Sequence, residues 1–198
     1  MAGRPRRRES FAERREQRAA IEDPALVLEA AARFLEVRSR SVHEVRRRLG
    51  GAGYRSDLVD GAIARMTELG MLDDETFARS WVESRDRARP RGERAIREEL
   101  RLKGIEREVV DVVLGERRDR ALEAVPGDGD DADLPPATAD RTAAERLLEK
   151  NARALARVID PRRRRQRAYA LLARHGFDPE TCREAAATLI DASDDGSA

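Results

Sequence analysis

The chain has 198 residues, of which 40% are charged and only 4% aromatic, and its formal net charge is +1. So few aromatic side chains argue against one large globular core and favour several small helical cores. One cysteine, Cys182, excludes an internal disulfide and a multi-cysteine metal site.

No apolar run is long enough to cross a membrane, and no apolar segment of a secretion signal follows the basic N-terminus. We therefore expect a cytoplasmic protein that does not interact with membranes.

Residues 1–24 are rich in Arg, Glu and Ala and offer few apolar anchors, chiefly Phe11 and Ile21. This composition predicts a disordered or fraying basic arm. An arm that grips nucleic acid is the alternative interpretation, although five acidic side chains accompany its seven arginines.

A pattern of helix, glycine, hydrophobic residue and second helix occurs three times, at residues 41–63, 92–114 and 164–186. The glycines are Gly53, Gly104 and Gly176, each placed to end a helix in the left-handed conformation. The spacing between copies becomes nearly equal when residues 126–140 are subtracted. That segment contains five Asp, three Pro, two Gly and no basic residue, which is typical of a linker.

Helix-start signals precede each copy of the pattern. Ser41 and Glu44 have the spacing of a capping box, and Ser56 is expected to cap the next helix. Asp73 is interpreted as a helix cap rather than a metal ligand. Asp160 and Asp178 each precede a proline, as at many helix starts.

No strand pattern is present, so the predicted fold is all-α, with three tandem three-helix repeats forming an elongated, curved array. The expected boundaries are as follows: arm 1–24, repeat one 25–72, repeat two 73–125, acidic linker 126–140, repeat three 141–191 and disordered tail 192–198.

The sequence contains no glycine-rich phosphate loop, no nucleophile-elbow motif and no paired-histidine zinc motif. His43 and His175 lie in different repeats, and Cys182 falls on a core position of the last helix. We therefore expect no catalytic residues, no cofactor and no metal.

Three stretches of the chain resemble motifs of the RecX family. The segment Ser41-Val42-His43-Glu44-Val45, followed by Leu49 and Gly53-Tyr54, resembles the family's opening motif. Residues 70–79 and 92–105 resemble its continuation. The likeness extends over residues 28–114 and more weakly over 167–189, and it does not include the arm.

The resemblance implies a regulator of the RecA recombinase, active in the control of DNA repair and the SOS response. Its repeats would lie in the groove of the RecA–single-stranded DNA filament, contact the DNA there, and restrain ATP hydrolysis and strand exchange. We expect a monomer. A helix-turn-helix-like DNA-binding module is the alternative function, and an inert helical adaptor is a third.

Basic side chains on the second helix of each repeat are the candidate partner-binding residues. For the cluster in the third repeat, a bound anion and a solvated arginine face are both open interpretations. The candidates are Arg46, Arg47, Arg48, Arg97, Arg101, Lys103, Arg162, Arg163, Arg164, Arg165 and Arg167.

Overall fold

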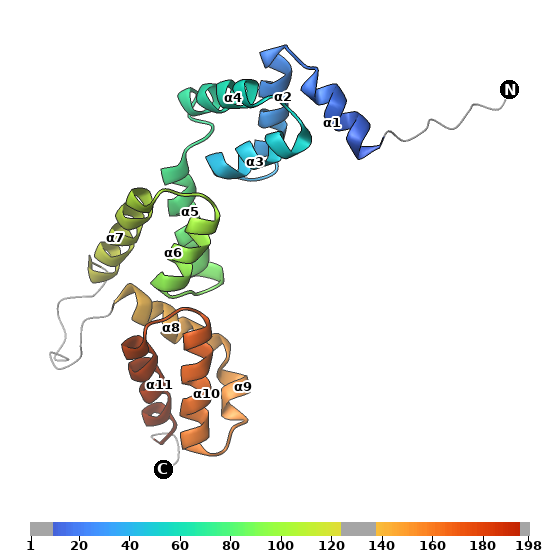
Figure 1. Cartoon of the computed structure of the whole chain (residues 1–198). Helices are drawn as coiled ribbons and strands as arrows, with labels where there is room; N and C mark the ends of the chain where they lie inside the picture. The colour runs from blue at the N-terminus through green and yellow to red at the C-terminus, as the bar shows by residue number, and fades with distance from the viewer. Residues whose placement is uncertain (1–9, 124–137, 195–198) are drawn as a thin grey trace. The chain divides into compact units, whose positions relative to one another are not determined.

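The computed structural model describes residues 10–123 and 138–194, with side chains to residue 188. All regular structure within these ranges is α-helical (Figure 1). The helices are α1 (Phe11–Ala19), α2 (Pro24–Leu35), α3 (Val42–Ala52), α4 (Ser56–Glu68), α5 (Asp74–Ala88), α6 (Glu93–Leu102), α7 (Arg107–Glu123), α8 (Ala139–Lys150), α9 (Ala152–Ala156), α10 (Pro161–Arg174) and α11 (Pro179–Asp194).

The chain divides into two compact units. The first unit contains residues 1–77 and 103–105, and the second contains residues 78–102 and 106–198. None of the helices in the described ranges is long and apolar enough to cross a bilayer.

The first unit is built around α2, α3 and α4, which pack against one another. Its core is aliphatic, since Val27, Val45, Leu49 and Met66 are all almost completely buried. The buried residues recur at helical spacing on each helix, so each helix presents one apolar stripe to the other two. The pairs include Val27 with Ala31, Val45 with Leu49 and Val59 with Ile63.

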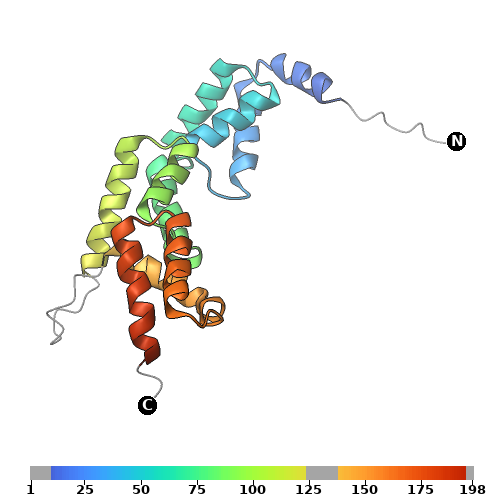
Figure 2. The same cartoon turned by 60° about the horizontal axis from the view of Figure 1, so that its bottom comes forward.

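The second unit contains two small cores rather than one. Residues such as Ile96, Leu100 and Leu114 are buried in α6 and α7. The second core lies among α8, α10 and α11, which lie side by side in both views (Figures 1 and 2). Cys182 is fully buried there, as its sequence position predicts, and burial raises the pKa of its thiol.

The predicted glycine stops are confirmed. Gly53, Gly104 and Gly176 have φ angles of 105°, 75° and 83°, and Gly70 adds a fourth at 67°. After α10, the N–H of Phe177 donates to the carbonyl of Leu172, which satisfies a carbonyl that the helix end would otherwise leave unpaired.

The helix α1 differs from the disordered or fraying arm that the composition predicts. Ser10 and Glu13 form a reciprocal capping box at its start. Arg18 donates to the carbonyl oxygen of Ala52, and its guanidinium lies over the ring of Tyr54. Polar contacts therefore hold a helix whose apolar anchors are too few to predict it.

Three boundaries also differ from the sequence-based expectation. Arg55, not Ser56, is the N-cap of α4, and it makes no side-chain capping bond. Thr138 caps α8, which begins at Ala139, so residues 138–140 belong to a helix and its cap rather than to the linker; residues 126–137 of the expected linker lie outside the described ranges. Finally, α11 continues to Asp194 and so extends into the expected tail.

Gly104 provides a test of what the glycine stops contribute. An added Cβ there would lie 2.3 Å from the Cβ of His43, whereas one at Gly70 would meet nothing within 4 Å. Both positions have a left-handed φ, so replacement by alanine costs about 1 kcal/mol at each. We expect Gly104→Ala to lower the free energy of unfolding by about 1–3 kcal/mol more than Gly70→Ala, because of the clash. Urea denaturation followed by circular dichroism measures the difference, and equal losses would contradict the close packing at Gly104.

Candidate functional site

The arginines of α3 differ in whether their guanidinium groups already contact other side chains of this chain. Both Nε and a terminal nitrogen of Arg46 bond to the carboxylate of Asp60, at 3.2 and 3.1 Å. The guanidinium of Arg48 lies 5.7 Å from the ring centre of Phe34. Arg47 is exposed, and no carboxylate in the described part of the chain pairs with it.

Lys103 pairs with a carboxylate of the first unit and is not one of the exposed basic side chains. Its Nζ is 2.7 Å from Glu44, whose carboxylate also accepts from Arg38 at 3.2 Å. The hydroxyl of Ser41 donates to the carbonyl oxygen of Lys103 at 2.6 Å. Burial raises the pKa of Glu44, but the bond and charge of Lys103 outweigh that effect, so the pKa lies below its ordinary value. The lysine therefore stabilises the start of α3.

The two arginines of α6 pair with carboxylates on or beside their own helix. Arg97 bonds to Asp111 and, at 3.2 Å, to Glu93, and these bonds raise the pKa of Arg97. Arg101 makes a two-pronged contact with Glu98 at 2.7 Å for each bond. Nearby carboxylates therefore neutralise the charges of both arginines. The i, i+4 spacing in the sequence indicates the Glu93–Arg97 pair, but no spacing indicates the pair of Arg97 with Asp111.

The cluster at the start of α10 is the most exposed set. Asp160 caps the helix by accepting from the N–H groups of Arg162 and Arg163, at 2.8 and 3.4 Å. Arg164 is partly buried, and its Nε donates to the carbonyl of Val158. The remaining two, Arg165 and Arg167, are exposed. Asp160 also pairs with the side chain of Arg163 at 3.6 Å, and the first turn of α10 contains no acidic residue, so the positive end of the helix dipole adds to the attraction for an external anion.

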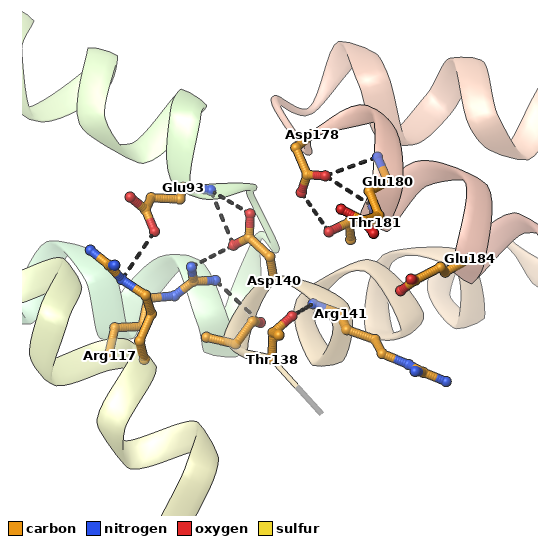
Figure 3. Close-up of a pocket in the computed structure, with 11 residues that line it drawn as sticks. Glu93, Arg117, Thr138, Asp140, Arg141, Asp178, Glu180, Thr181 and Glu184 are labelled. Atoms are coloured by element: carbon orange, nitrogen blue, oxygen red, sulfur yellow. Dashed lines mark hydrogen bonds and ion pairs between the residues drawn. The ribbon is translucent and has the colours of Figure 1, made fainter. Parts of the chain in front are cut away.

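A second polar group, which the sequence does not predict, lies in the second unit. Arg117 on α7 is only 3% exposed and lies between two carboxylates. It bonds to Asp86 at 2.9 Å and to Asp140 at 2.6 Å, and Asp140 also accepts from the backbone N–H of Glu93 (Figure 3). One carboxylate from α8 thus binds a side chain of α7 and the first N–H of α6.

The charges of this group depend on one another. Burial lowers the pKa of Arg117, but the bonds to Asp86 and Asp140 outweigh it and raise the pKa above its ordinary value. For Asp140, burial is the largest influence and raises the pKa, which Arg117 and the N–H of Glu93 oppose. The pKa of Asp140 remains above its ordinary value, and Arg117 opposes the protonation that burial favours.

The open hollow beside this cluster, of about 460 Å³, does not resemble a catalytic site. Asp178 on its rim caps α11, accepting from the N–H groups of Glu180 and Thr181 (Figure 3). The described residues contain no cluster of His, Cys, Asp and Glu that could hold a metal. The carboxylates here stabilise helix starts, and the Thr181 hydroxyl donates to Asp178, the carboxylate that caps its own helix.

A signal for Arg117 was present in the sequence. The buried residues of α7 are Val110, Val113, Leu114 and Arg117, all on one helical stripe. A charged residue on an apolar stripe needs a buried partner. The partner could not be found from spacing, because Asp140 lies in the segment that composition assigns to the linker.

Comparisons with known proteins place family domains on all three repeats. The model of the first three-helix domain of RecX matches residues 28–66, that of the second matches 73–114, and that of the third matches 139–186. The order of the domains is the same as in the family.

Similar curated proteins include regulatory protein RecX of Mycolicibacterium vanbaalenii, which is 37% identical over 134 residues, covering 61% of this chain and 70% of that protein. Regulatory protein RecX of Mycobacterium ulcerans is 32% identical over 145 residues, covering 73% of each chain. The crystal structure of RecX from Lactobacillus salivarius has a TM-score of 0.66 at 19% identity, covering 85% of this chain and 97% of that one. At that identity the structural likeness concerns the fold.

Removal of Arg117 should be strongly destabilising. Arg117→Met leaves Asp140 buried without its cation, so we expect a loss of about 3–5 kcal/mol in the free energy of unfolding. Arg118→Met is the matched control, because Arg118 is 55% exposed and its contact with Glu93 is 3.4 Å long, so a loss under about 1 kcal/mol is expected. Chemical denaturation measures the free energy of unfolding of both variants. Similar losses would show that the buried ion pairs of Arg117 contribute no more to stability than the exposed contact of Arg118.

The Glu44–Lys103 pair should make stability depend on pH. The folded-state pKa of Glu44 lies below its unfolded value. Its contribution is therefore complete above the unfolded pKa and is lost as the pH falls through the folded pKa. We expect Glu44→Gln to cost about 1–3 kcal/mol near pH 7 and less near pH 3. Thermal unfolding between pH 3 and pH 7 measures the stability difference between the original chain and Glu44→Gln. A difference that increases as the pH falls would contradict the expected pH dependence.

Proposed function

Because the chain belongs to the RecX family of regulatory proteins, we propose that it binds the filament of RecA recombinase on single-stranded DNA and limits the recombinase's activity. The observation that carries the proposal is the match of three successive three-helix domains to the three RecX domains, in the same order. Several small domains can each contribute a weak contact, and linked weak contacts add up to tight binding.

The surface chemistry supports a polar, charge-dependent contact. Of the basic candidates, Arg97, Arg101 and Lys103 already have carboxylate partners within the chain. Arg47 and the exposed arginines at the start of α10 are more available. We therefore propose that the partner is held mainly through α3 and α10, with α6 contributing less.

We also propose that the protein acts by binding and not by catalysis, as a monomer. The support is its family and the structural use of its buried carboxylates, which cap helices and pair with Arg117. Carboxylates that are committed in this way are not available as bases or nucleophiles.

The direct test is RecA ATPase activity on single-stranded DNA. Substoichiometric amounts of the chain should reduce the steady-state rate, and the chain alone should hydrolyse no ATP. An undiminished rate at a several-fold molar excess of the chain would contradict the proposed function. ATP hydrolysis by the chain alone, lost in a point variant, would contradict the absence of catalysis.

Paired variants test which helix carries the contact. Replacing Arg162 and Arg165 by Glu should raise the concentration needed for half inhibition by about tenfold or more, because exposed arginines bind carboxylate or phosphate directly. Replacing Arg97 and Arg101 by Gln is the control and should change it less than about threefold. Circular dichroism checks that helicity is kept. A larger effect of the α6 pair would show that the assignment to α10 is wrong.

A further inference from the structure

The first unit contains a groove of about 640 Å³, and six of its eleven lining residues are arginine. One wall is α1, which presents Phe11, Arg14 and Arg18 at i, i+3 and i+7 and therefore on one face. The opposite wall is the second half of α3. The remaining lining residues are Phe34, Arg38, Arg40, Glu44, Arg47, Arg48, Gly51 and Ala52.

The wall that α1 forms is fixed against α3. A Cβ at Gly53 would lie 2.7 Å from the carbonyl oxygen of Arg15, so only glycine allows this approach. Arg18 adds its bond to Ala52 and its contact with Tyr54. The groove is therefore a preformed feature of the first unit, and preformed sites lose less entropy when a ligand binds.

Among the residues that line the groove, positive charge exceeds negative charge. Its lining contains six arginines and one acidic residue, Glu44. The carboxylate of Glu44 is 7% exposed and already accepts from Lys103 and Arg38. So many like charges in one concavity attract anions from solution.

Arg40 has a hydrogen-bond donor that nothing in the described part of the chain satisfies. Its Nε is buried and has no hydrogen-bond partner. Its guanidinium lies 4.3 Å from the ring centre of Phe34, against which Arg48 also stacks. Stacking uses the face of a guanidinium and leaves the N–H groups in its plane free to bind an oxygen anion.

We propose that this groove binds the sugar–phosphate backbone of a single-stranded nucleic acid, with a base stacked on Phe11. Arginine forks fit phosphate oxygens, and Phe11 is 62% exposed at the edge of the groove. A basic groove beside an exposed aromatic ring is the combination that holds unpaired strands. An acidic peptide would satisfy the arginines but would leave the ring unused. The proposal goes beyond the proposed function, because it concerns nucleic acid bound by this chain alone.

The test is the fluorescence anisotropy of a labelled oligothymidylate of about 20 nucleotides, titrated with the full chain at several salt concentrations. The double variant Arg14→Ala and Arg47→Ala should weaken binding about tenfold or more. It should also reduce the slope of log affinity against log salt by about 1.4, since each phosphate contact on a single strand contributes about 0.7. The control is Arg33→Ala with Arg65→Ala, which removes the same charge from exposed positions of α2 and α4 outside the groove. The control should change affinity less than about threefold.

A second variant tests the base contact. Phe11→Ala should weaken binding of the oligothymidylate by at least about fivefold and leave binding of a duplex of equal length unchanged. Equal effects of the groove and control pairs would overturn the proposal. The proposal would also be overturned if Phe11→Ala bound the oligonucleotide with unaltered affinity and polyglutamate displaced the oligonucleotide completely. That result would assign the groove to acidic peptides. Oligonucleotide binding without RecA inhibition would overturn only the proposed function, and inhibition without oligonucleotide binding would overturn only this inference.

Discussion

The second unit depends on one buried cation, Arg117, which must keep both of its carboxylates. A guanidinium that is 3% exposed has lost its hydration, and the bonds to Asp86 and Asp140, with longer ones to two backbone carbonyls, compensate for that loss. Asp140 also accepts from the first N–H of α6, so its carboxylate favours the start of that helix as well. Elements from the second and third repeats thereby share one polar centre. The pairing fixes which helix faces meet, because an unpaired buried charge would penalise other arrangements.

Because the helical cores are small, ion pairs and other polar contacts contribute much to holding the helices together. Each repeat buries only a few aliphatic side chains, so polar contacts supplement the packing. Arg85 illustrates this: it lies 4.1 Å from the centre of the Trp81 ring and bonds to Glu99 at 2.6 Å, while the indole N–H donates to the same carboxylate. Arg79 and Glu116 add a two-pronged pair between α5 and α7. In a sequence with 38 arginines, most of them cannot be assigned a role from position alone.

The arginines therefore separate into those that hold the fold and those that face solvent. Arg97, Arg101 and Arg117 have carboxylate partners, and Arg46 has Asp60. The exposed group at the start of α10 and the groove between α1 and α3 each contain more arginines than carboxylates, with Asp160 and Glu44 as the acidic partners. Both are suited to anions, as the proposed contact with a protein–DNA filament requires. Their separation in different units allows the two proposals to be tested independently.

The sequence by itself determined the all-α fold, the threefold pattern and the positions of the glycine stops, because helix periodicity and left-handed caps are local properties. It also determined that Cys182 is buried, since the residue lies on an apolar stripe. Local signals did not reveal α1, whose stability comes from contacts of Arg15 and Arg18 with α3. Only the tertiary structure decided which arginines are available, because Asp111, Asp140 and Asp60 lie on other helices than the arginines they neutralise. An ion pair between helices depends on packing, and a one-dimensional spacing contains no information about which faces will meet.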